Sequence, residues 1–336
     1  MTKTNDIITY YITGIGGFLG ENIIIELEKQ SNIRIIGFVL PREKDFPWLK
    51  RDNITLIEGN ILNKDDVYRF LNTESNGKKV VIHAAGKITT VKNGDKITYD
   101  INYGGTKNVV DVINELNTFD KLVYVSSVDA LPRRKDKDDI FEVDRFDNKL
   151  VDGVYSKSKA DSNNYVLDNC HINCSIVMPS AMMGPNDHSL TPINNAINKL
   201  LNKKLPAITK GGYNIADVRD VAKGIISCVD KGRDKQSYIL SGEYISVKDL
   251  MDTACEMTNQ KRIKTTIPHF VIKLISPFIE LHAKIHHKTP LFTGFSMDCL
   301  KQNSNYNYKK AREELNYSSR PLKETIKDTI NYLQSL

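Results

Sequence analysis

Four tyrosines in this chain are each followed, four positions later, by a lysine, and such a pair can support proton transfer. The pairs are Tyr103/Lys107, Tyr155/Lys159, Tyr244/Lys248 and Tyr306/Lys310. Residues four apart on a helix share one face, so the ammonium can lie beside the phenol. A neighbouring cation stabilises the phenolate and lowers the tyrosine pKa from about 10 toward the range useful for general acid and base catalysis. Because all four pairs share this spacing, only their positions along the chain can show which pair is catalytic.

Only Tyr155 and Lys159 stand at the start of a predicted helix that follows a predicted strand ending in serines. The predicted strand covers residues 122–126, and the predicted helix covers residues 155–170. Ser126 is the last residue of the strand, and Ser127 follows it directly. A hydroxyl in such a place can donate a hydrogen bond to an oxygen on which negative charge develops. The sequence therefore predicts an acid and base site built on Tyr155 and Lys159.

Three glycines at the first predicted turn indicate a binding site for a dinucleotide. Gly14, Gly17 and Gly20 lie between a predicted buried strand, residues 7–13, and a predicted helix, residues 18–27. Glycines allow a tight turn there and let the backbone approach a pyrophosphate at the helix N-terminus. Since the triplet opens a strand-to-helix unit, it predicts cofactor binding more strongly than the glycines alone would.

The elements that must position these residues alternate regularly over the first half of the chain. Apolar, β-branched runs predict strands at residues 7–13, 33–40, 54–58, 80–84, 122–126 and 172–178. Helical periodicity predicts helices at residues 18–27, 64–71, 97–116 and 155–170. This alternation is typical of an α/β fold with a Rossmann-type, doubly wound parallel sheet.

The alternation ends after Pro179, where prolines interrupt short mixed segments. We therefore expect an NAD(P)-binding Rossmann domain over residues 1–180, to which residues 214–240 return. A smaller, mixed, substrate-binding lobe is expected over residues 181–213 and 241–336. The apolar stretch at residues 268–285 predicts a core or pocket-lining helix, with peripheral membrane contact as the alternative, and it is too short to span a bilayer.

Composition excludes several classes of partner and site. The net charge of +6 is the small difference between 47 basic and 41 acidic side chains, which argues against nucleic-acid binding. The mixed charge run at residues 133–139 predicts an exposed loop. Five cysteines without CxxC spacing predict free thiols in a reducing compartment and no metal site. Without an apolar N-terminal signal or a membrane span, the expected location is the cytoplasm.

Several segments resemble the extended short-chain dehydrogenases/reductases of the NAD-dependent epimerase/dehydratase family. Residues 13–20, TGIGGFLG, are similar to the family's TGxxGxxG turn, and residues 155–160, YSKSKA, to its YxxSK segment. Further similar segments follow in the family's order: GNI at 59–61, HAAG at 83–86, PSAMMGP at 179–185 and KKAREELNY at 309–317. The resemblance covers nearly the full length, although Asp161 is shifted from the position of the family's acidic residue.

This resemblance implies a role for each matched residue. Ser127, with Ser126 as the alternative, would donate a hydrogen bond to the substrate oxygen, Tyr155 would exchange the proton, and Lys159 would also hold ribose hydroxyls. Asn102 would have a supporting role. The implied cofactor residues are Gly14, Gly17, Phe18, Leu19, Arg42, Asn60, Ile61, Ala84, Ala85, Tyr155, Lys159 and Pro179. The implied substrate residues are Lys87, Met182 and Tyr213. His83 is interpreted as a packed histidine at a strand end.

The choice between NADP and NAD depends on the end of the second strand. NAD enzymes usually place a carboxylate there to bind the ribose 2′-hydroxyl, but residues 39–42, VLPR, contain none. Arg42 would instead face a 2′-phosphate, which favours NADP slightly over NAD.

The absence of a diphosphate-binding arginine suggests the class of substrate. Sugar-nucleotide epimerases and dehydratases commonly carry an arginine before the later Asp-Val element to bind the diphosphate, and here Tyr213 stands near that place. The pattern is more similar to the dihydroflavonol reductase and 3β-hydroxysteroid dehydrogenase branch. That similarity implies a small, hydrophobic ring substrate with a ketone or a secondary alcohol.

Two other functions stay open. The first is a nucleoside-diphosphate-sugar epimerase or dehydratase with retained NAD. The second is a protein that binds the cofactor as a signal, which retention of the Tyr155/Lys159 pair disfavours. By the same family resemblance, the helices at residues 97–116 and 155–170 imply a homodimer.

Overall fold

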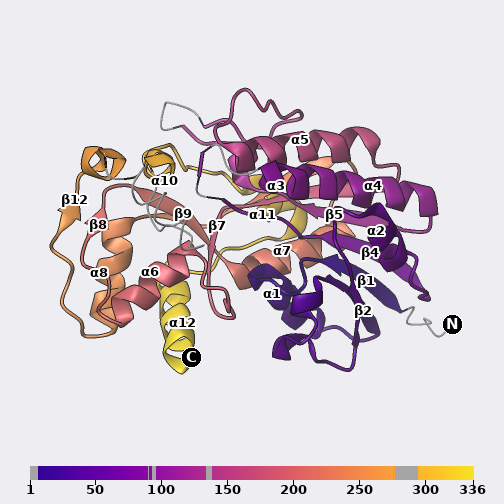
Figure 1. The fold of residues 1–336 in the computed structure, drawn as a ribbon, viewed down its shortest axis with the longest axis horizontal. Coiled ribbons are helices and arrows are strands. Elements are labelled where there is room, and N and C mark those ends of the chain that lie inside the picture. Colours follow the sequence, from indigo (N-terminus) through magenta and orange to yellow (C-terminus); the bar gives the residue numbers. More distant parts are fainter. Residues whose placement is uncertain (1–6, 90, 93–95, 134–137, 275, 277–293) are drawn as a thin grey trace.

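The computed structural model describes residues 7–89, 91–92, 96–133, 138–274, 276 and 294–336. Within these residues seven strands form one parallel sheet (Figure 1) in the order β10, β6, β5, β4, β1, β2, β3. The strands are β1 (Ile8–Thr13), β2 (Ile33–Val39), β3 (Ile54–Glu58), β4 (Lys78–His83), β5 (Lys121–Val125), β6 (Cys174–Pro179) and β10 (Gln236–Leu240). The order reverses between β1 and β4, and doubly wound sheets open a ligand crevice at such a switch point.

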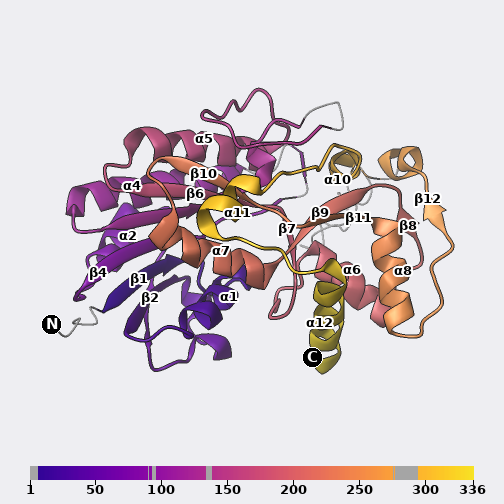
Figure 2. The same cartoon turned by 180° about the vertical axis from the view of Figure 1, so that it is seen from behind.

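Helices cover both faces of this sheet, as Figures 1 and 2 show from opposite sides. One face packs against α1 (Phe18–Leu27), α7 (Val218–Lys231) and α11 (Lys309–Leu315). The other face packs against α2 (Lys64–Leu71), α4 (Gly105–Leu116) and α5 (Val154–Asn169). Successive strand side chains alternate between the two cores: Tyr10 lies in the first and Tyr11 in the second, both fully buried. A strand buried on both faces must be apolar throughout, which explains the continuous apolar runs of the sequence.

A third core, which we call the lobe core, is formed by later elements. Two small sheets contribute to it: β7 (Ala181–Met183) with β9 (Gly212–Asp217) and β11 (Glu243–Ser246), and β8 (Ile208–Thr209) with β12 (Thr266–Ile267). Its helices are α6 (Pro192–Leu201), α8 (Val247–Met257), α10 (Gly294–Cys299) and α12 (Leu322–Ser335). Apolar side chains such as Ile197, Leu250 and Ile326 fill the space between them.

The predicted α/β class and parallel Rossmann-type sheet are confirmed. Three of the predicted elements, residues 18–27, 54–58 and 64–71, have the predicted bounds, and the others differ by a few residues. The helix predicted over 97–116 is instead α3 (Lys96–Tyr99), a π-helical turn over Asp100–Gly104, and α4.

The predicted division into domain and lobe stays a proposal, which packing amends in one place. The expected lobe included residues 309–317, but Ala311, Leu315 and Tyr317 pack in the first sheet core. Of the helix predicted over 268–285, residues 269–274 and 276 are helical and most of the remainder lies outside the described residues. None of the helices in the described part of the chain is long and apolar enough to cross a membrane.

Candidate active site

The glycine turn joins β1 to α1 at the carboxyl edge of the sheet. Gly14 has φ +74°, and a Cβ added to it would lie 2.7 Å from Ala85 N, so only glycine fits this conformation and this close approach to the end of β4. Gly20 is equally constrained, because its Cβ would lie 2.3 Å from Gly14 O. A Cβ on Gly17 would meet only Gly14 O, at 3.4 Å, so the space in front of α1 is open.

A buried hydrogen-bond chain fixes the end of β4 beside this turn. Thr13 Oγ1 lies 2.6 Å from His83 Nδ1 and accepts a hydrogen bond from Ala85 N at 3.1 Å. His83 Nε2 lies 3.0 Å from Thr106 Oγ1. Burial, together with the charge of Lys159, lowers the pKa of His83 to about 3, so its ring is neutral. The interpretation of His83 as a packed strand-end residue is therefore confirmed.

The two strand-end serines have different environments. Ser127 Oγ accepts a hydrogen bond from Asp129 N at 3.1 Å and caps a short 3₁₀ helix, Val128–Ala130. Its hydroxyl is also near enough to Tyr155 to lower the pKa of that phenol, so the two predicted catalytic side chains are neighbours. Ser126 Oγ is buried and has no hydrogen-bond partner among the described residues. The proximity of Tyr155 favours Ser127 over its neighbour.

Tyr155 and Lys159 lie on the first turns of α5, facing the end of β5. Lys159 is 4% exposed and Nζ donates to Val125 O at 2.9 Å and to Tyr124 OH at 3.3 Å. The same ammonium lies 4.9 Å from the centre of the Tyr124 ring. A Cβ on Gly86 would lie 3.4 Å from Lys159 Nζ, so the loop after β4 runs directly past the lysine.

Asn102 holds that loop against α5. Its side chain accepts from Lys87 N at 2.8 Å, donates to Lys87 O at 3.0 Å and donates to Ser158 Oγ at 3.0 Å. Asn102 is 1% exposed and lies in the π-helical turn, which brings its amide to this position. This geometry agrees with a supporting role, in which Asn102 contacts Ser158 and the backbone of Lys87 and makes no direct hydrogen bond with Tyr155.

The structure differs from the sequence prediction on the pKa of Tyr155. The sequence predicted a pKa lowered by Lys159, but here burial raises the pKa of this phenol, and the negative charge of Asp129 raises it further. The hydroxyl of Ser127 opposes both effects. The reason for the difference is that the ammonium of Lys159 is directed at Val125 O and Tyr124.

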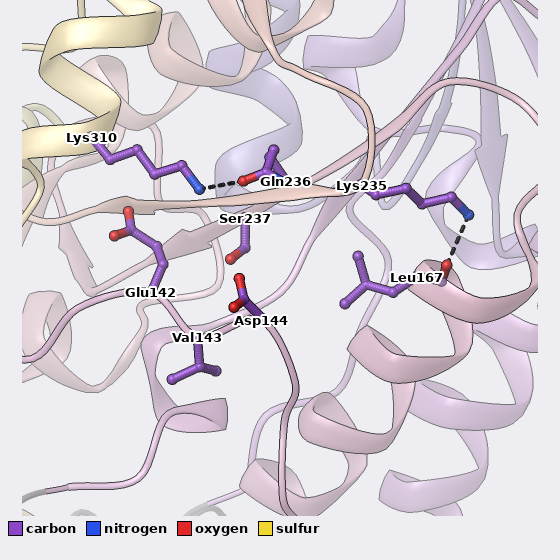
Figure 3. A pocket seen from close by; sticks show the side chains of 8 residues that line it. All are labelled: Glu142, Val143, Asp144, Leu167, Lys235, Gln236, Ser237 and Lys310. Atoms are coloured by element: carbon purple, nitrogen blue, oxygen red, sulfur yellow. Dashed lines mark hydrogen bonds between the residues drawn. The ribbon is translucent and has the colours of Figure 1, made fainter.

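The three other tyrosine and lysine pairs have structural partners of their own. Lys107 binds Asp111 and Tyr165, and Lys248 binds Asp252 on an exposed helix face. Figure 3 shows Lys310 at a polar cavity of about 330 Å³ beside the edge strand β10, where it donates to Gln236. The pairs therefore share only the spacing.

The residues expected to bind the adenosine half follow β2 and β3 at the carboxyl edge of the sheet. Asn60 Oδ1 accepts from Leu62 N at 3.0 Å, and its second lone pair remains for an amino group. Arg42 is exposed and makes no hydrogen bond or ion pair with the described residues. Glu43 turns back toward the glycines: Oε2 accepts from Leu40 N at 3.1 Å and would lie 3.4 Å from a Cβ on Gly16. The sequence interpretation did not single out Glu43.

The remaining expected residues are the other cofactor residues and the substrate residues. Phe18 and Leu19, which follow the turn, are almost fully buried in the first sheet core, and Ile61 is almost fully buried in the second, against α4. Ala84 and Ala85 are half-buried at the end of β4. Pro179 ends β6 and pairs with Leu240. Of the expected substrate residues, Lys87 follows β4, Met182 lies on β7 and Tyr213 on β9. Burial raises the pKa of Tyr213 to about 12.

These residues fit a nicotinamide dinucleotide. The N-terminus of α1 has no side-chain cap and faces the open space beside Gly17, which suits a pyrophosphate. At the other end of the crevice, Ser126 Oγ and Ser180 Oγ are buried at the ends of β5 and β6 without a partner in the described structure. Unsatisfied buried hydroxyls are uncommon and suit a ligand that completes their hydrogen bonds. Among the described residues, no group of three or more His, Cys, Asp or Glu side chains could hold a metal ion.

Comparison with known proteins identifies the family. The model of the NAD-dependent epimerase/dehydratase family matches residues 10–241. The chain belongs to this family. It is thus an oxidoreductase of the extended short-chain dehydrogenase/reductase type, and the predicted resemblance to this family is confirmed.

Curated relatives of this family member match it over nearly their whole length. A Synechocystis protein provisionally named dihydroflavonol 4-reductase is 25% identical, over 97% of this chain and 94% of its own. Sterol-4-alpha-carboxylate 3-dehydrogenase erg26, decarboxylating, of Schizosaccharomyces pombe is 23% identical, over 95% and 96%. The 2-alkyl-3-oxoalkanoate reductase of Shewanella oneidensis is 22% identical, over 92% and 82%.

Solved structures share the fold over the full chain. The crystal structure of gox2253 superposes with a TM-score of 0.82 at 26% identity, covering 98% of each chain. UDP-glucuronic acid 4-epimerase from Bacillus cereus, in complex with UDP-glucuronic acid and NAD, superposes with a TM-score of 0.73 at 16% identity, covering 97% of this chain and 99% of its own. The second likeness shows the fold alone.

Proposed function

We propose that this family member transfers a hydride between a nicotinamide cofactor and the carbonyl or carbinol carbon of a small, hydrophobic ring substrate. The observation that carries the proposal is the meeting of two chain segments at the carboxyl edge of β5. Ser127 follows that strand, and Lys159, one turn after Tyr155 on α5, donates to Val125 O at 2.9 Å. Relatives named as a dihydroflavonol reductase, a sterol dehydrogenase and an oxoalkanoate reductase support a ketone or alcohol as the reacting group.

In the proposed reduction, Tyr155 is the proton donor. When bound, the nicotinamide cofactor supplies the hydride that reduces the carbonyl carbon. Ser127 donates a hydrogen bond to the carbonyl oxygen, stabilising the negative charge that develops on it. Tyr155 gives its phenolic proton to that oxygen, and in the oxidation direction its phenolate takes the proton back.

Lys159 and Asn102 hold this arrangement together in the proposed mechanism. The Lys159 ammonium stabilises the phenolate that remains after proton transfer, and it would also bind ribose hydroxyls of the cofactor. To do so it leaves Val125 O or Tyr124 OH, its partners in the structure. Asn102 fixes the backbone of Lys87, which limits how far the loop beside Lys159 can move.

Two charged residues after β2 bear on the cofactor. The sequence favoured NADP because Arg42 could face a 2′-phosphate, and Arg42 is exposed without a partner in the described structure. The carboxylate of Glu43, however, lies against Gly16. A carboxylate in this region accepts from ribose hydroxyls and repels a phosphate. We therefore infer that NAD is preferred and that Arg42 supports residual use of NADP.

This inference is tested by kcat/KM with NADH and NADPH in the wild type and in two variants. Glu43→Gln removes the repulsion without changing size, and we expect at least a tenfold shift toward NADPH. Arg42→Gln should lower activity with NADPH and leave NADH unchanged. A wild type that prefers NADPH, with the preference lost in Arg42→Gln, would contradict the inference and restore the choice made from the sequence.

The proposed substrate class is tested by a screen of purified protein with both cofactors. Steroid, flavonoid and simple cyclic ketones are compared with UDP- and dTDP-sugars, by turnover and by the melting temperature. We expect turnover of cyclic ketones and no stabilisation by sugar nucleotides. Co-purified NAD together with stabilisation by sugar nucleotides would favour an epimerase or dehydratase. The homodimer through α4 and α5 stays a prediction, and sedimentation of the same sample measures it.

A further inference from the structure

The positive charge of this chain is concentrated in two segments. Residues 199–212 and 260–274, which we call the basic tip, together contain eight lysine and arginine side chains and no aspartate or glutamate. The remainder of the chain holds 39 basic and 41 acidic side chains, so its net charge is slightly negative. The basic tip therefore carries all of the net positive charge of the protein. A charge distribution of this kind indicates an anionic partner for that part of the molecule.

The two segments of the basic tip lie side by side in the structure. Strands β8 and β12 pair with each other in parallel. Gln260 Nε2 donates to Leu201 O at 3.1 Å, and His269 Nε2 lies 3.0 Å from Lys210 O. Figures 1 and 2 show β8 and β12 at the end of the molecule opposite the seven-stranded sheet. The charges of both segments thus belong to one surface region.

Almost all of these basic side chains are exposed to solvent. Lys199 alone among the eight is half-buried. Lys273 pairs with Asp298 of α10 at 2.8 Å, and the other seven make no ion pair with any residue that the structure describes. Their charge is therefore available to a partner outside the chain. The exposed members are Lys203, Lys204, Lys210, Lys261, Arg262, Lys264 and Lys273.

The mixed charge run at residues 133–139 differs from the basic tip, because acidic residues alternate with its basic ones. The sequence predicted an exposed loop there, and for Arg133 this is wrong. Its side chain pairs with Asp129 and donates to Cys299 O at 3.1 Å. Residues 134–137 of this run lie outside the described residues.

The helical residues 269–274 present apolar side chains outward as well as inward. Ile272 is 3% exposed and packs in the lobe core, which anchors one side of the helix. Phe270 and Leu274, four positions apart and hence on one face, are each 73% exposed. No large apolar side chain in the described part of the chain is more exposed. A surface helix normally keeps its apolar residues toward the core, so this outward pair indicates a contact surface.

Apolar side chains accompanied by many exposed lysines and arginines are typical of a helix that lies in the interface of a bilayer. The apolar groups enter the headgroup region, and the long basic side chains reach anionic headgroups. A soluble polyanion would also attract the lysines, but it would leave Phe270 and Leu274 in water. The pairing of charge with an outward apolar face therefore favours a lipid surface.

We propose that the basic tip docks peripherally on a bilayer that contains anionic lipids, with Phe270 and Leu274 entering the headgroup region. The proposal goes beyond the proposed function, because it concerns where the protein works and not which reaction it performs. It takes up the membrane contact that the sequence left open for residues 268–285, and it rests only on the described part of that stretch.

The test measures co-sedimentation of the full-length protein with sucrose-loaded vesicles. One set of vesicles is pure phosphatidylcholine, and in the other about one third of the lipid is phosphatidylglycerol. We expect the wild type to partition at least tenfold more strongly onto the anionic vesicles at low salt. Binding should weaken as salt is added, because salt screens the attraction between the lysines and the headgroups.

Two double variants separate the charge from the apolar contact. Lys203→Gln with Lys204→Gln should lower partition onto the anionic vesicles at least fivefold, because two cations near the surface are lost. Phe270→Ser with Leu274→Ser should also lower it at least fivefold, because less apolar surface enters the bilayer. All four side chains are exposed, so both variants should keep the melting temperature of the wild type.

Matched controls remove the same kinds of group from the sheet domain. Lys223→Gln with Lys231→Gln removes two exposed lysines of α7, and Phe141→Ser removes an aromatic ring that is 52% exposed. We expect both controls to bind the anionic vesicles as the wild type does. Loss of binding in the two tip variants alone would support the proposal.

Two results would overturn the proposal. The first is equal partition of the wild type onto neutral and anionic vesicles. The second is wild-type binding by Phe270→Ser with Leu274→Ser, and retention on heparin that Lys203→Gln with Lys204→Gln abolishes would then assign the basic tip to a soluble polyanion. Neither result bears on hydride transfer, which is tested separately by turnover.

Discussion

At the scale of single residues, the chemistry depends on the surroundings of the Tyr155 phenol. Burial disfavours the phenolate, and the nearby carboxylate of Asp129 disfavours it further, so the phenol stays protonated without an additional cation beside it. The hydroxyl of Ser127 acts in the opposite direction and lowers the pKa of the phenol. A protonated phenol is the form needed to reduce a ketone, and the phenolate is the form needed to oxidise an alcohol.

The raised pKa of Tyr155 gives the two directions of the reaction different pH profiles. Reduction needs the protonated phenol and should be independent of pH from about 6 to 8. Oxidation needs the phenolate, whose fraction grows about tenfold per pH unit below the pKa, so its kcat/KM should rise steadily with pH over the same range. Initial rates in both directions measure this. An oxidation rate that is level from pH 6 to 8 would show that the phenol has a pKa below this range when cofactor is bound.

Sequence reasoning proposed Tyr155, Lys159 and Ser127 as catalytic residues, and it singled out neither Glu43 nor the contact of Arg133 with Cys299. The first three lie where a strand ends and a helix begins, so local order along the chain was enough to select them. Arg133 contacts Cys299, 166 positions away, and no local pattern records a contact of that kind.

At the scale of elements, the strands and helices of the first half were predictable because each is long and has one period. The strands alternate between two apolar cores, and α4 and α5 follow helical spacing. The π-helical turn over Asp100–Gly104 was not predicted, since a single extra residue in a helix leaves the apolar pattern almost unchanged. That turn positions Asn102, so the part missed by the pattern is a part that supports the site.

The glycine turn offers a test at this scale. Gly14→Ala places a Cβ 2.8 Å from Ala84 O at a φ of +74°, so the end of β4 must shift, at a cost of about 1–3 kcal/mol in folding free energy. Cofactor affinity should fall with it. Denaturant unfolding and cofactor titration measure the two effects. Gly104→Ala is the matched control, since its Cβ meets nothing closer than 3.7 Å and should not destabilise the protein. Equal behaviour of the two variants would mean that the turn does not require glycine.

At the scale of the whole molecule, a cluster of charges joins α7 to the elements of the lobe core. Arg320 Nη2 binds Asp220 at 2.7 Å, and Arg219 binds both Asp217 and, on α12, Asp328 at 2.7 Å. Asp217 is fully buried at the N-terminus of α7. The lobe core could not be predicted in detail. Its strands β8 and β12 have two residues each and form only through their pairing with each other, which is distant in sequence.

Removing one partner of this cluster should loosen the lobe core. Arg320→Ala leaves Asp220 nearly buried without its main partner, and we expect a loss of about 3 kcal/mol in unfolding free energy. Arg145→Ala breaks an exposed pair and should cost less than about 1 kcal/mol. Chemical denaturation of the two variants compares them directly. If Arg320→Ala cost no more than the exposed control, the cluster would not be what holds α12 to α7.

The central claim, that Tyr155 exchanges the proton in a hydride transfer, is tested most directly by Tyr155→Phe. This variant removes only the phenolic oxygen, and the ring still packs at the start of α5. We predict that kcat with a cyclic ketone falls by about 10²–10⁴-fold while the dissociation constant for the cofactor changes less than about threefold. Retention of wild-type turnover in Tyr155→Phe would contradict the account.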